Sequence, residues 1–147
     1  MSNEKVTVRW ALRNNKAEIK KEGEYEVIAE KLSSKWLDIV SMKEASLYED
    51  YVSYEMLKSG KRVSRGTVIF CAAKHFKFID PKLIYKIDGD EIIVSAKSYA
   101  KSVEIINEND DMLLEDNYFD MNGDERRIKI LNGIPQGIKL RSVYDIR

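Results

Sequence analysis

Apolar residues recur at every second position over much of this 147-residue chain. The first such run places Val6, Val8, Trp10 and Leu12 on one side, with polar or small residues between them. Because successive side chains of a β-strand point to opposite faces, a period of two predicts a strand with one buried face. The recurrence of this pattern along the chain predicts an all-β fold.

Several further segments carry the same alternation and are expected to be strands. In residue numbers they are 52–56, 68–72, 83–87, 92–96, 103–106, 127–131 and 138–144. The turn Asp88-Gly89-Asp90, between two alternating runs, predicts a β-hairpin. One stretch differs, because between Ser33 and Ala45 the apolar spacing is closer to that of a helix. A short helix or compact loop is expected there.

The charged residues balance, with 25 Lys plus Arg against 25 Asp plus Glu. A formal net charge of zero gives no overall field that would hold a nucleic-acid backbone or an anionic membrane surface. No apolar run in the sequence approaches the roughly 20 residues of a membrane-spanning helix. We therefore expect no nucleic acid and no membrane among the partners of this chain.

A short segment near residue 120 is the most specific motif of the chain. It consists of Asp116, Asn117, Tyr118, Phe119 and Asp120, followed by a turn at Gly123. With an expected strand on either side, this segment resembles the last immunoglobulin-like domain of the β-mannosidases of glycoside hydrolase family 2. The family usually has a proline before the glycine of that turn, and this chain does not. We expect the motif to be architectural, with one aromatic ring in the core and its hydroxyl, if it is the tyrosine, bound to the backbone.

Earlier parts of the chain resemble the preceding domain of the same family. The matching features are the strand around Trp10, the Ser-Ser-Lys-Trp run that ends at Trp36, and the Lys-His-Phe run before Asp80-Pro81. The resemblance implies two small immunoglobulin-like β-sandwich domains in tandem. Proline restricts the residue before it and often opens a strand, so we place the boundary there, giving domains 1–79 and 80–147. Two complete sandwiches need roughly 200 residues, so the first is expected to be a partial penultimate sandwich.

The resemblance also implies a role as the non-catalytic C-terminal accessory module of a retaining β-mannosidase. The two catalytic glutamates of such an enzyme lie on a (β/α)8 barrel of about 250 residues, which this sequence does not contain. No catalytic, cofactor-binding or metal-binding residue is therefore assigned. Asn107-Glu108 lies in a polar run that predicts a loop. The run Asp120-x-Asn122-x-Asp124 lacks the glycine and the glutamate of a calcium-binding loop.

Aromatic residues are the remaining basis for an independent activity, because sugar-binding sandwiches stack pyranose rings on exposed ones. The candidates for sugar binding or for an interface are Trp36, Tyr48 and Tyr51, whereas Trp10 and Tyr54 are in phase with core positions. The alternative function is thus a free-standing immunoglobulin-like module for carbohydrate binding or adhesion. The expected partners are other domains of the parent glycosidase. Carbohydrate is a further candidate. A second copy of the chain is another, and it would bind through an exposed edge of the first domain.

Overall fold

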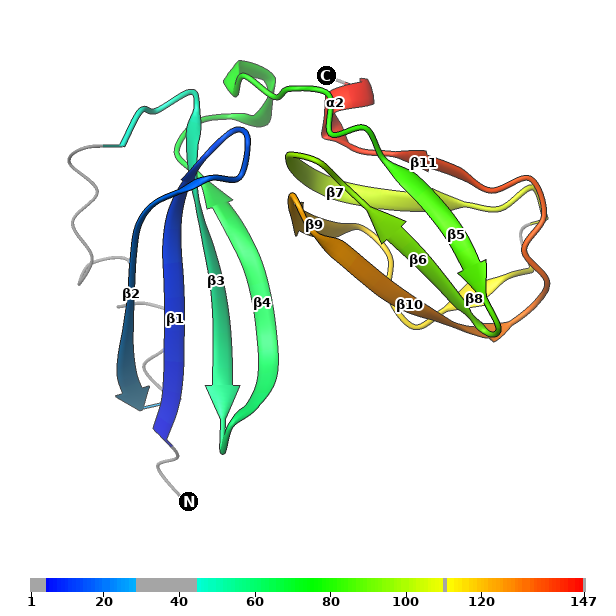
Figure 1. Cartoon of the computed structure of the whole chain (residues 1–147), viewed down its shortest axis with the longest axis horizontal. Coiled ribbons are helices and arrows are strands. Elements are labelled where there is room, and N and C mark those ends of the chain that lie inside the picture. Colours follow the sequence, from blue (N-terminus) through cyan, green and yellow to red (C-terminus); the bar gives the residue numbers. More distant parts are fainter. Residues whose placement is uncertain (1–4, 29–44, 110, 147) are drawn as a thin grey trace.

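The computed structural model describes residues 5–28, 45–109 and 111–146, and its regular secondary structure is almost entirely antiparallel β-sheet. Figure 1 shows two bodies side by side, one built from β1 to β4 and the other from the later strands. The prediction of an all-β fold with two immunoglobulin-like domains in tandem is confirmed. The helix or compact loop expected between Ser33 and Ala45 lies outside the described residues, apart from Ala45 itself.

The described residues of the first domain form one four-stranded sheet. Its strands are β1 (Lys5–Asn14), β2 (Ile19–Ile28), β3 (Asp50–Lys58) and β4 (Lys61–Ile69), in the order β2-β1-β3-β4. The alternation predicted for β1 is confirmed, because Val6, Val8, Trp10 and Leu12 are all buried. The intervening residues of β1 therefore form the opposite, largely polar face of the sheet.

A row of four residues crosses this sheet and accounts for two of its glycines. Trp10 pairs with Gly23 of β2, and Tyr54 pairs with Gly66 of β4. Trp10 and Tyr54 are also direct partners across β1 and β3. A Cβ atom at Gly23 would lie 2.7 Å from the Trp10 ring, and one at Gly66 would lie 2.7 Å from the Tyr54 hydroxyl. Both rings therefore spread outward over residues that are small enough to admit them.

A short connection leads from the first sheet to the second domain. β4 ends at Ile69, so the strand expected over 68–72 begins earlier and stops three residues earlier than predicted. The connection then contains the 3-10 helix η2 (Ala73–His75) and passes Asp80-Pro81 before the next strand begins. Lys77 N–H donates to the Tyr48 carbonyl at 2.7 Å, which ties the connection back to the first domain.

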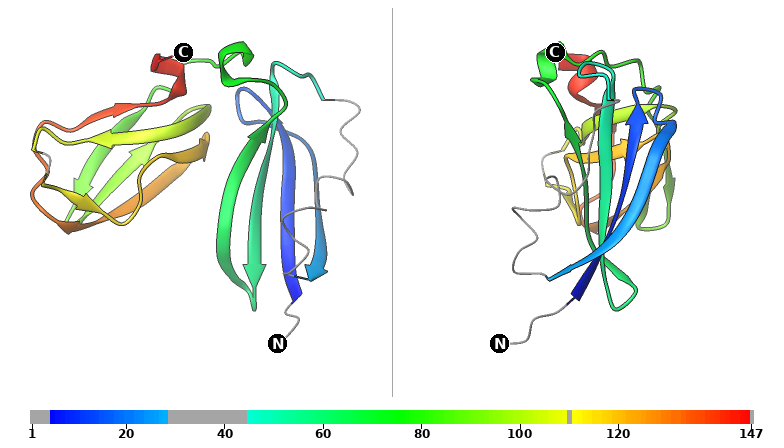
Figure 2. Two further views of the ribbon diagram at one scale, coloured as in Figure 1. Left: turned by 180° about the vertical axis from the view of Figure 1, so that it is seen from behind. Right: turned by 90° about the vertical axis from the view of Figure 1, so that its left-hand side faces the viewer.

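Seven strands form the second domain. They are β5 (Ile84–Asp88), β6 (Glu91–Ser95), β7 (Tyr99–Ile106), β8 (Leu113–Leu114), β9 (Phe119–Asn122), β10 (Glu125–Asn132) and β11 (Lys139–Arg141). One sheet has the order β5-β6-β10-β8 and the other the order β11-β7-β9 (Figure 2). The core residues that meet between them are Ile92, Val94, Ala96, Ala100, Val103, Ile105, Phe119, Met121 and Ile128. Seven strands in two packed sheets are typical of an immunoglobulin-type sandwich.

The hairpin predicted at Asp88-Gly89-Asp90 is confirmed. Asp88 pairs with Glu91 across the end of β5 and β6, and Gly89 has a φ angle of 60°. The strand expected over 138–144 is confined to β11, and the short helix α2 (Val143–Ile146) follows it. Ser142 N–H donates to the Asp145 carboxylate at 2.7 Å, a capping contact that starts the helix and so ends the strand.

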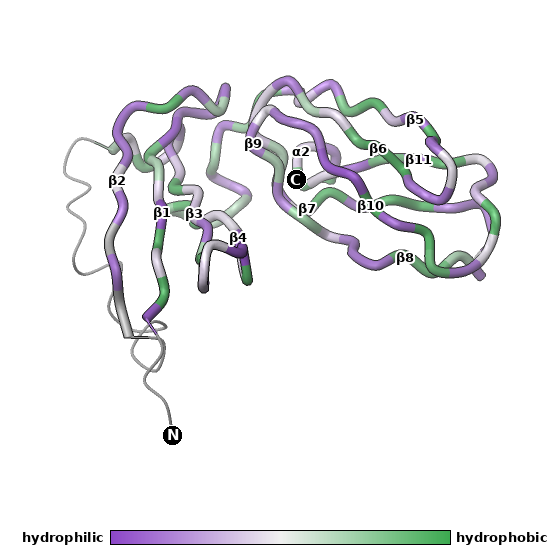
Figure 3. Tube along the Cα trace, turned by 60° about the horizontal axis from the view of Figure 1, so that its bottom comes forward, coloured by the Kyte–Doolittle hydropathy of each residue, from purple (hydrophilic) through white to green (hydrophobic). Residues whose placement is uncertain are grey.

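β2 is an edge strand in which the alternation is incomplete. Three consecutive charged residues, Lys20, Lys21 and Glu22, interrupt the apolar pattern, and Figure 3 colours much of the strand purple to white. Charged residues on an edge strand oppose pairing with another chain. Among the described residues, no helix is long and apolar enough to cross a membrane.

Candidate functional site

Four aromatic rings join the two domains at the end of the sheet nearest the connection. Tyr51 of β3 stacks on Tyr99 of β7, with 3.6 Å between ring centroids and 12° between ring planes. Phe76 and Phe78, from the connection, lie 5.7 Å and 5.8 Å from the Tyr99 ring. All four residues are buried and form one cluster. An edge-on pair such as Phe76–Tyr99 adds about 0.5 to 1.5 kcal/mol to the effect of burial alone.

The hydroxyl groups of the two stacked tyrosines are satisfied across the domain boundary. Tyr51 donates to the Asn122 side-chain oxygen at 2.9 Å. Thr67 of β4 donates to the Asp120 carboxylate at 2.6 Å, so the contact of 2.6 Å between Thr67 and Tyr99 has the tyrosine as its donor. Burial is the main cause that raises the pKa of both tyrosines well above their ordinary value. Both rings therefore stay neutral while the interface is formed.

The Asp-Asn-Tyr-Phe-Asp motif fixes β9 against β7 through its polar side chains. Asn117 accepts from the Ile105 N–H at 2.8 Å and donates to the Ile105 carbonyl at 3.1 Å, so its amide behaves like a strand residue. Asp120 accepts from the Ser102 N–H at 2.8 Å, where the register of β7 shifts and Ser102 has a φ angle of 52°. With the contact to Thr67, the motif ties the bulge of β7 to the first domain.

The two aromatic residues of the motif point to different environments. Phe119 is buried in the core, whereas Tyr118 is 64% exposed and has a φ angle of 60°. The Tyr118 hydroxyl donates to the Glu104 carboxylate at 2.5 Å. As expected, one ring of the motif enters the core; it is that of Phe119, and the tyrosine hydroxyl binds a side chain rather than the backbone. The hydrogen bond from Tyr118 is the main cause that lowers the pKa of Glu104, and the hydrogen bond and positive charge of Arg141 lower it further.

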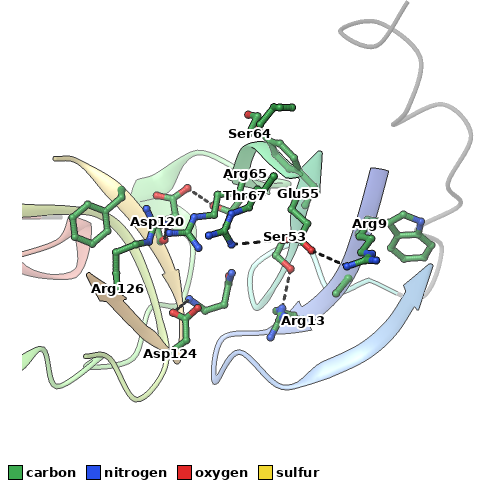
Figure 4. Close-up of a pocket in the computed structure, with 18 of the residues that line it drawn as sticks. Arg9, Arg13, Ser53, Glu55, Ser64, Arg65, Thr67, Asp120, Asp124 and Arg126 are labelled. Atoms are coloured by element: carbon green, nitrogen blue, oxygen red, sulfur yellow. Dashed lines mark hydrogen bonds and ion pairs between the residues drawn. The ribbon is translucent and has the colours of Figure 1, made fainter. Parts of the chain in front are cut away.

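Beyond the aromatic cluster, the polar face of the first sheet and the β9 region of the second domain enclose a cleft of about 740 Å³ (Figure 4). The first domain contributes Arg9, Arg13, Ser53, Glu55, Arg65 and Thr67 to its wall. The second domain contributes Asp116, Tyr118, Asp120, Asn122, Asp124 and Arg126. The cleft is thus lined by charges of both signs, and its arginines come from both domains.

Arg126 is held firmly by its own domain. It lies 4.8 Å over the Phe119 ring, donates to the Asp120 carbonyl at 3.0 Å and pairs with the Asp116 carboxylate at 3.4 Å. These contacts combine a cation–π interaction with two polar ones. Burial lowers the pKa of Arg126, and the acidic neighbours oppose this effect.

The comparisons with known proteins agree with this architecture. A family model described as a mannosidase Ig/CBM-like domain matches residues 1–75, which is about half of the chain. The chain belongs to the family of mannosidase Ig/CBM-like domains. An Ig-fold domain model matches residues 78–146 of the same chain. The predicted resemblance to mannosidase immunoglobulin-like domains is therefore confirmed.

A solved structure shares the fold of this mannosidase Ig/CBM-like chain. It is the crystal structure of the β-D-mannosidase from Dictyoglomus thermophilum, with a TM-score of 0.66 and 14% sequence identity. The match covers 96% of this chain and 19% of that chain. This chain therefore spans about a fifth of the length of the mannosidase it matches. No curated protein sequence matches it.

The residues singled out in the sequence lie at different places in the mannosidase Ig/CBM-like chain. Tyr51 is fully buried in the interdomain cluster, so contact between domains describes its position and no ring face is open to a sugar. Tyr48 is 49% exposed and lies outside the cleft wall. Trp36 falls outside the described residues. Gly123 has a φ angle of 66° in the turn after β9, and a Cβ atom there would lie 3.3 Å from that of Ala17 in the first domain.

The polar runs of the second domain have structural contacts. Asn107 bridges two loops, because its side chain donates to the carbonyls of Asn109 and Ile134 and accepts from the Gln136 N–H at 2.7 Å. Asp124 accepts from the Asn122 N–H at 3.0 Å within the turn. Within the described ranges, no group of three or more His, Cys, Asp or Glu side chains is placed to hold a metal ion.

The arginines that line the cleft and the contacts of Asp120 do not form a motif in the sequence. A signal for them exists, because Arg9 and Arg13 are out of phase with the apolar face of β1. Alternation then places their side chains on the opposite face of the sheet. It does not indicate that a second domain lies over that face.

Proposed function

We propose that this chain is a non-catalytic accessory region of a β-mannosidase-type enzyme of glycoside hydrolase family 2, which removes terminal β-linked mannose by a retaining mechanism. The chain would complete the fold of that enzyme and pack against its other domains. Support comes from the two tandem family matches and from the fold shared with a β-D-mannosidase over 96% of this chain.

The observation that carries a structural role is the interface between the two domains. The stacked tyrosine pair and the Thr67–Asp120 hydrogen bond each join one domain to the other. Two phenylalanine rings of the connection pack against the tyrosine pair. Such a contact holds the domains in one relative orientation, because the rings are buried and the hydroxyls are satisfied. A module with a fixed shape can present both of its domains to a neighbouring catalytic domain at once.

The carboxylates of the cleft already have structural partners. A retaining glycosidase needs two carboxyl groups about 5 Å apart, one of them free to attack the sugar. Asp120 accepts from Thr67 and from the Ser102 N–H, and Asp116 pairs with Arg126. Freeing either carboxylate would break a contact that shapes the cleft. Their roles are therefore better described as structural than as catalytic.

Two measurements test this proposal. The isolated chain should not hydrolyse an aryl β-mannoside, and the gene upstream of these codons should encode a (β/α)8 barrel with two catalytic glutamates. Turnover that survives purification and disappears in Asp120→Asn or Asp116→Asn would refute the non-catalytic role. An upstream sequence that encodes no barrel would refute the assignment to a glycosidase.

A second candidate function is carbohydrate binding, and one observation favours it. The ring of Tyr118 is 64% exposed beside a cleft that carries arginine and aspartate side chains. Sugars are commonly bound by an aromatic face with charged hydrogen-bonding groups around it. Titration of mannobiose into the chain and into Tyr118→Ala decides this function, since saturable binding that the substitution abolishes would support it.

A further inference from the structure

Arg65 differs from the other arginines that line the interdomain cleft. Arg9 pairs with Glu24 at 2.9 Å, and Arg62 pairs with Glu55 at 3.6 Å. Arg13 donates to the Ser53 hydroxyl at 2.8 Å. No hydrogen bond or ion pair of the Arg65 side chain joins it to any residue in the part of the chain that the structure describes. Among the described residues, this guanidinium with its five N–H donors therefore has no hydrogen-bond acceptor in the cleft.

Burial and neighbouring positive charge outweigh the acidic groups around Arg65. Burial, followed by the neighbouring guanidinium groups of Arg126 and Arg62, lowers the pKa of Arg65 to about 10. Asp124 and Asp116 oppose this shift, but Asp124 accepts from the Asn122 N–H and Asp116 pairs with Arg126. Figure 4 shows Arg65 and Arg126 approaching each other from the two domains beside Asp120. Two like charges brought together in this way are stabilised when an anion joins them.

We propose that this cleft is a binding site for a carboxylate ligand, with Arg65 as its principal contact and Arg62 and Arg126 as supporting positive charges. The inference goes beyond the proposed function, because it does not depend on the identity of the parent enzyme. A guanidinium fork matches the two oxygens of a carboxylate in a planar, bidentate arrangement.

The walls of the cleft favour this anion over a more highly charged one. Asp116, Asp120 and Asp124 line the opposite side, and they would repel a phosphate dianion more strongly than a single carboxylate. A volume of about 740 Å³ is within the range of small-molecule sites. It would admit an acidic sugar, and it would equally admit a glutamate side chain from another polypeptide segment.

The experiment is a titration of the full chain at low ionic strength, about 0.02 M, where screening of such contacts is weak. The probes are D-mannuronate, D-mannose and the α-amide of N-acetylglutamate, and the readout is the arginine Nε–H signals in NMR spectra. Mannuronate and mannose differ only in whether the terminal carbon is a carboxylate. Saturable movement of the Arg65 signal by both acids, and not by mannose, is the expected result.

Variants make the assignment specific. Arg65→Met should weaken binding by about tenfold or more, because a charged hydrogen-bonded contact is lost, and Arg65→Lys should restore part of it. Arg127→Met is the matched control, since Arg127 is exposed on β10 and pairs with Asp88 and Glu91 away from the cleft. A melting temperature close to that of the parent chain shows that each variant is folded.

The outcomes separate cleanly. Mannuronate that binds more tightly than the glutamate derivative identifies an acidic sugar as the ligand, and the reverse order identifies an acidic side chain. Equal affinities support recognition of the shared carboxylate alone. Binding of mannose as strong as that of mannuronate would overturn the proposal. So would an Arg65 signal that neither acid moves, or an affinity that Arg65→Met leaves unchanged.

Discussion

Removal of the Tyr99 ring should be among the most destabilising single changes in this chain. Tyr99 is 1% exposed, stacks on Tyr51 at 3.6 Å, and contacts the rings of Phe76 and Phe78. Truncation of a buried large aromatic residue to alanine typically costs about 3 to 5 kcal/mol. The lost hydrogen bond to Thr67 adds roughly 1 kcal/mol. Tyr99→Ala should therefore lower the free energy of unfolding by about 4 to 6 kcal/mol.

Two substitutions divide this loss into its parts. Tyr99→Phe keeps the stacked ring and removes only the hydroxyl, so it should cost about 1 kcal/mol, because Thr67 still donates to Asp120. Tyr48→Ala is the matched control in the first domain, since its ring is 49% exposed, and it should change stability by no more than about 0.5 kcal/mol. Urea unfolding followed by circular dichroism measures all three.

Coupling between the domains can be measured in the same assay. Tyr51→Ala and Tyr99→Ala remove the two halves of one contact, so the double variant should lose less than the sum of the single losses by roughly 0.5 to 3 kcal/mol. The core of the second sandwich does not include Tyr99, so that sandwich should keep its fold when the interface is lost. If Tyr99→Ala cost no more than Tyr48→Ala, or if the two tyrosine substitutions were strictly additive, the interface would not have the role given to it.

Three further predictions concern pH, the core and the first sheet. The raised pKa values of Tyr51 and Tyr99 mean that above about pH 10 only the unfolded chain releases these two protons. Stability is then fully present below that pH and falls above it by up to about 2.7 kcal/mol per pH unit, an effect that the lowered pKa of Arg65 partly offsets. Urea unfolding at about pH 8 and about pH 11 checks this, and ionisation of all eight tyrosines in the folded chain would contradict it. Phe119→Ala should lower the free energy of unfolding by about 3 to 5 kcal/mol, because the ring is buried in the core. Asn107→Ala should lower it by about 1 to 2 kcal/mol, because the Asn107 side chain joins two loops. Urea or thermal melts measure both. Gly23→Ala should cost about 1 to 3 kcal/mol because the added methyl group meets the Trp10 ring, whereas Glu22→Ala, one residue away, should melt like the parent chain.

The strands with one buried face could be predicted because burial and alternation agree in them. In β1 the alternating residues Val6, Val8, Trp10 and Leu12 are buried. In β6 Ile92 and Val94 are buried as the alternation predicts, and Ile93 on the opposite face is buried as well. β2 could not be predicted in this way, because it is an edge strand with charged residues on both faces. Its pairing with β1 holds it in the extended conformation. The end of β11 fails for a local reason, because the Ser142–Asp145 contact starts a helix that alternation does not predict.

The candidate site could be predicted only in part, because its contacts are long-range. The motif from Asp116 to Asp120 is recognisable in the sequence, and the burial of Phe119 follows from the alternation of an extended segment. The partners of Asp120 do not follow, since Thr67 is 53 residues away in the chain and belongs to the other domain. The possible dimer through the edge of the first domain stays a prediction, which size-exclusion chromatography at high concentration tests.

The position of the cleft follows from how burial changes along a single face of β3. Tyr51, Ser53 and Glu55 occupy successive positions on the face that looks toward the second domain. Tyr51 is 0% exposed, Ser53 is 6% exposed, and the Glu55 side chain is 31% exposed. Because all three share one face of one strand, this gradient reflects distance from the second domain rather than the pattern of the strand. The two domains are in contact near the connection and separate with distance from it, as Figure 1 shows. Four residues along β3 therefore separate the buried aromatic contact at Tyr51 from the polar cleft at Glu55.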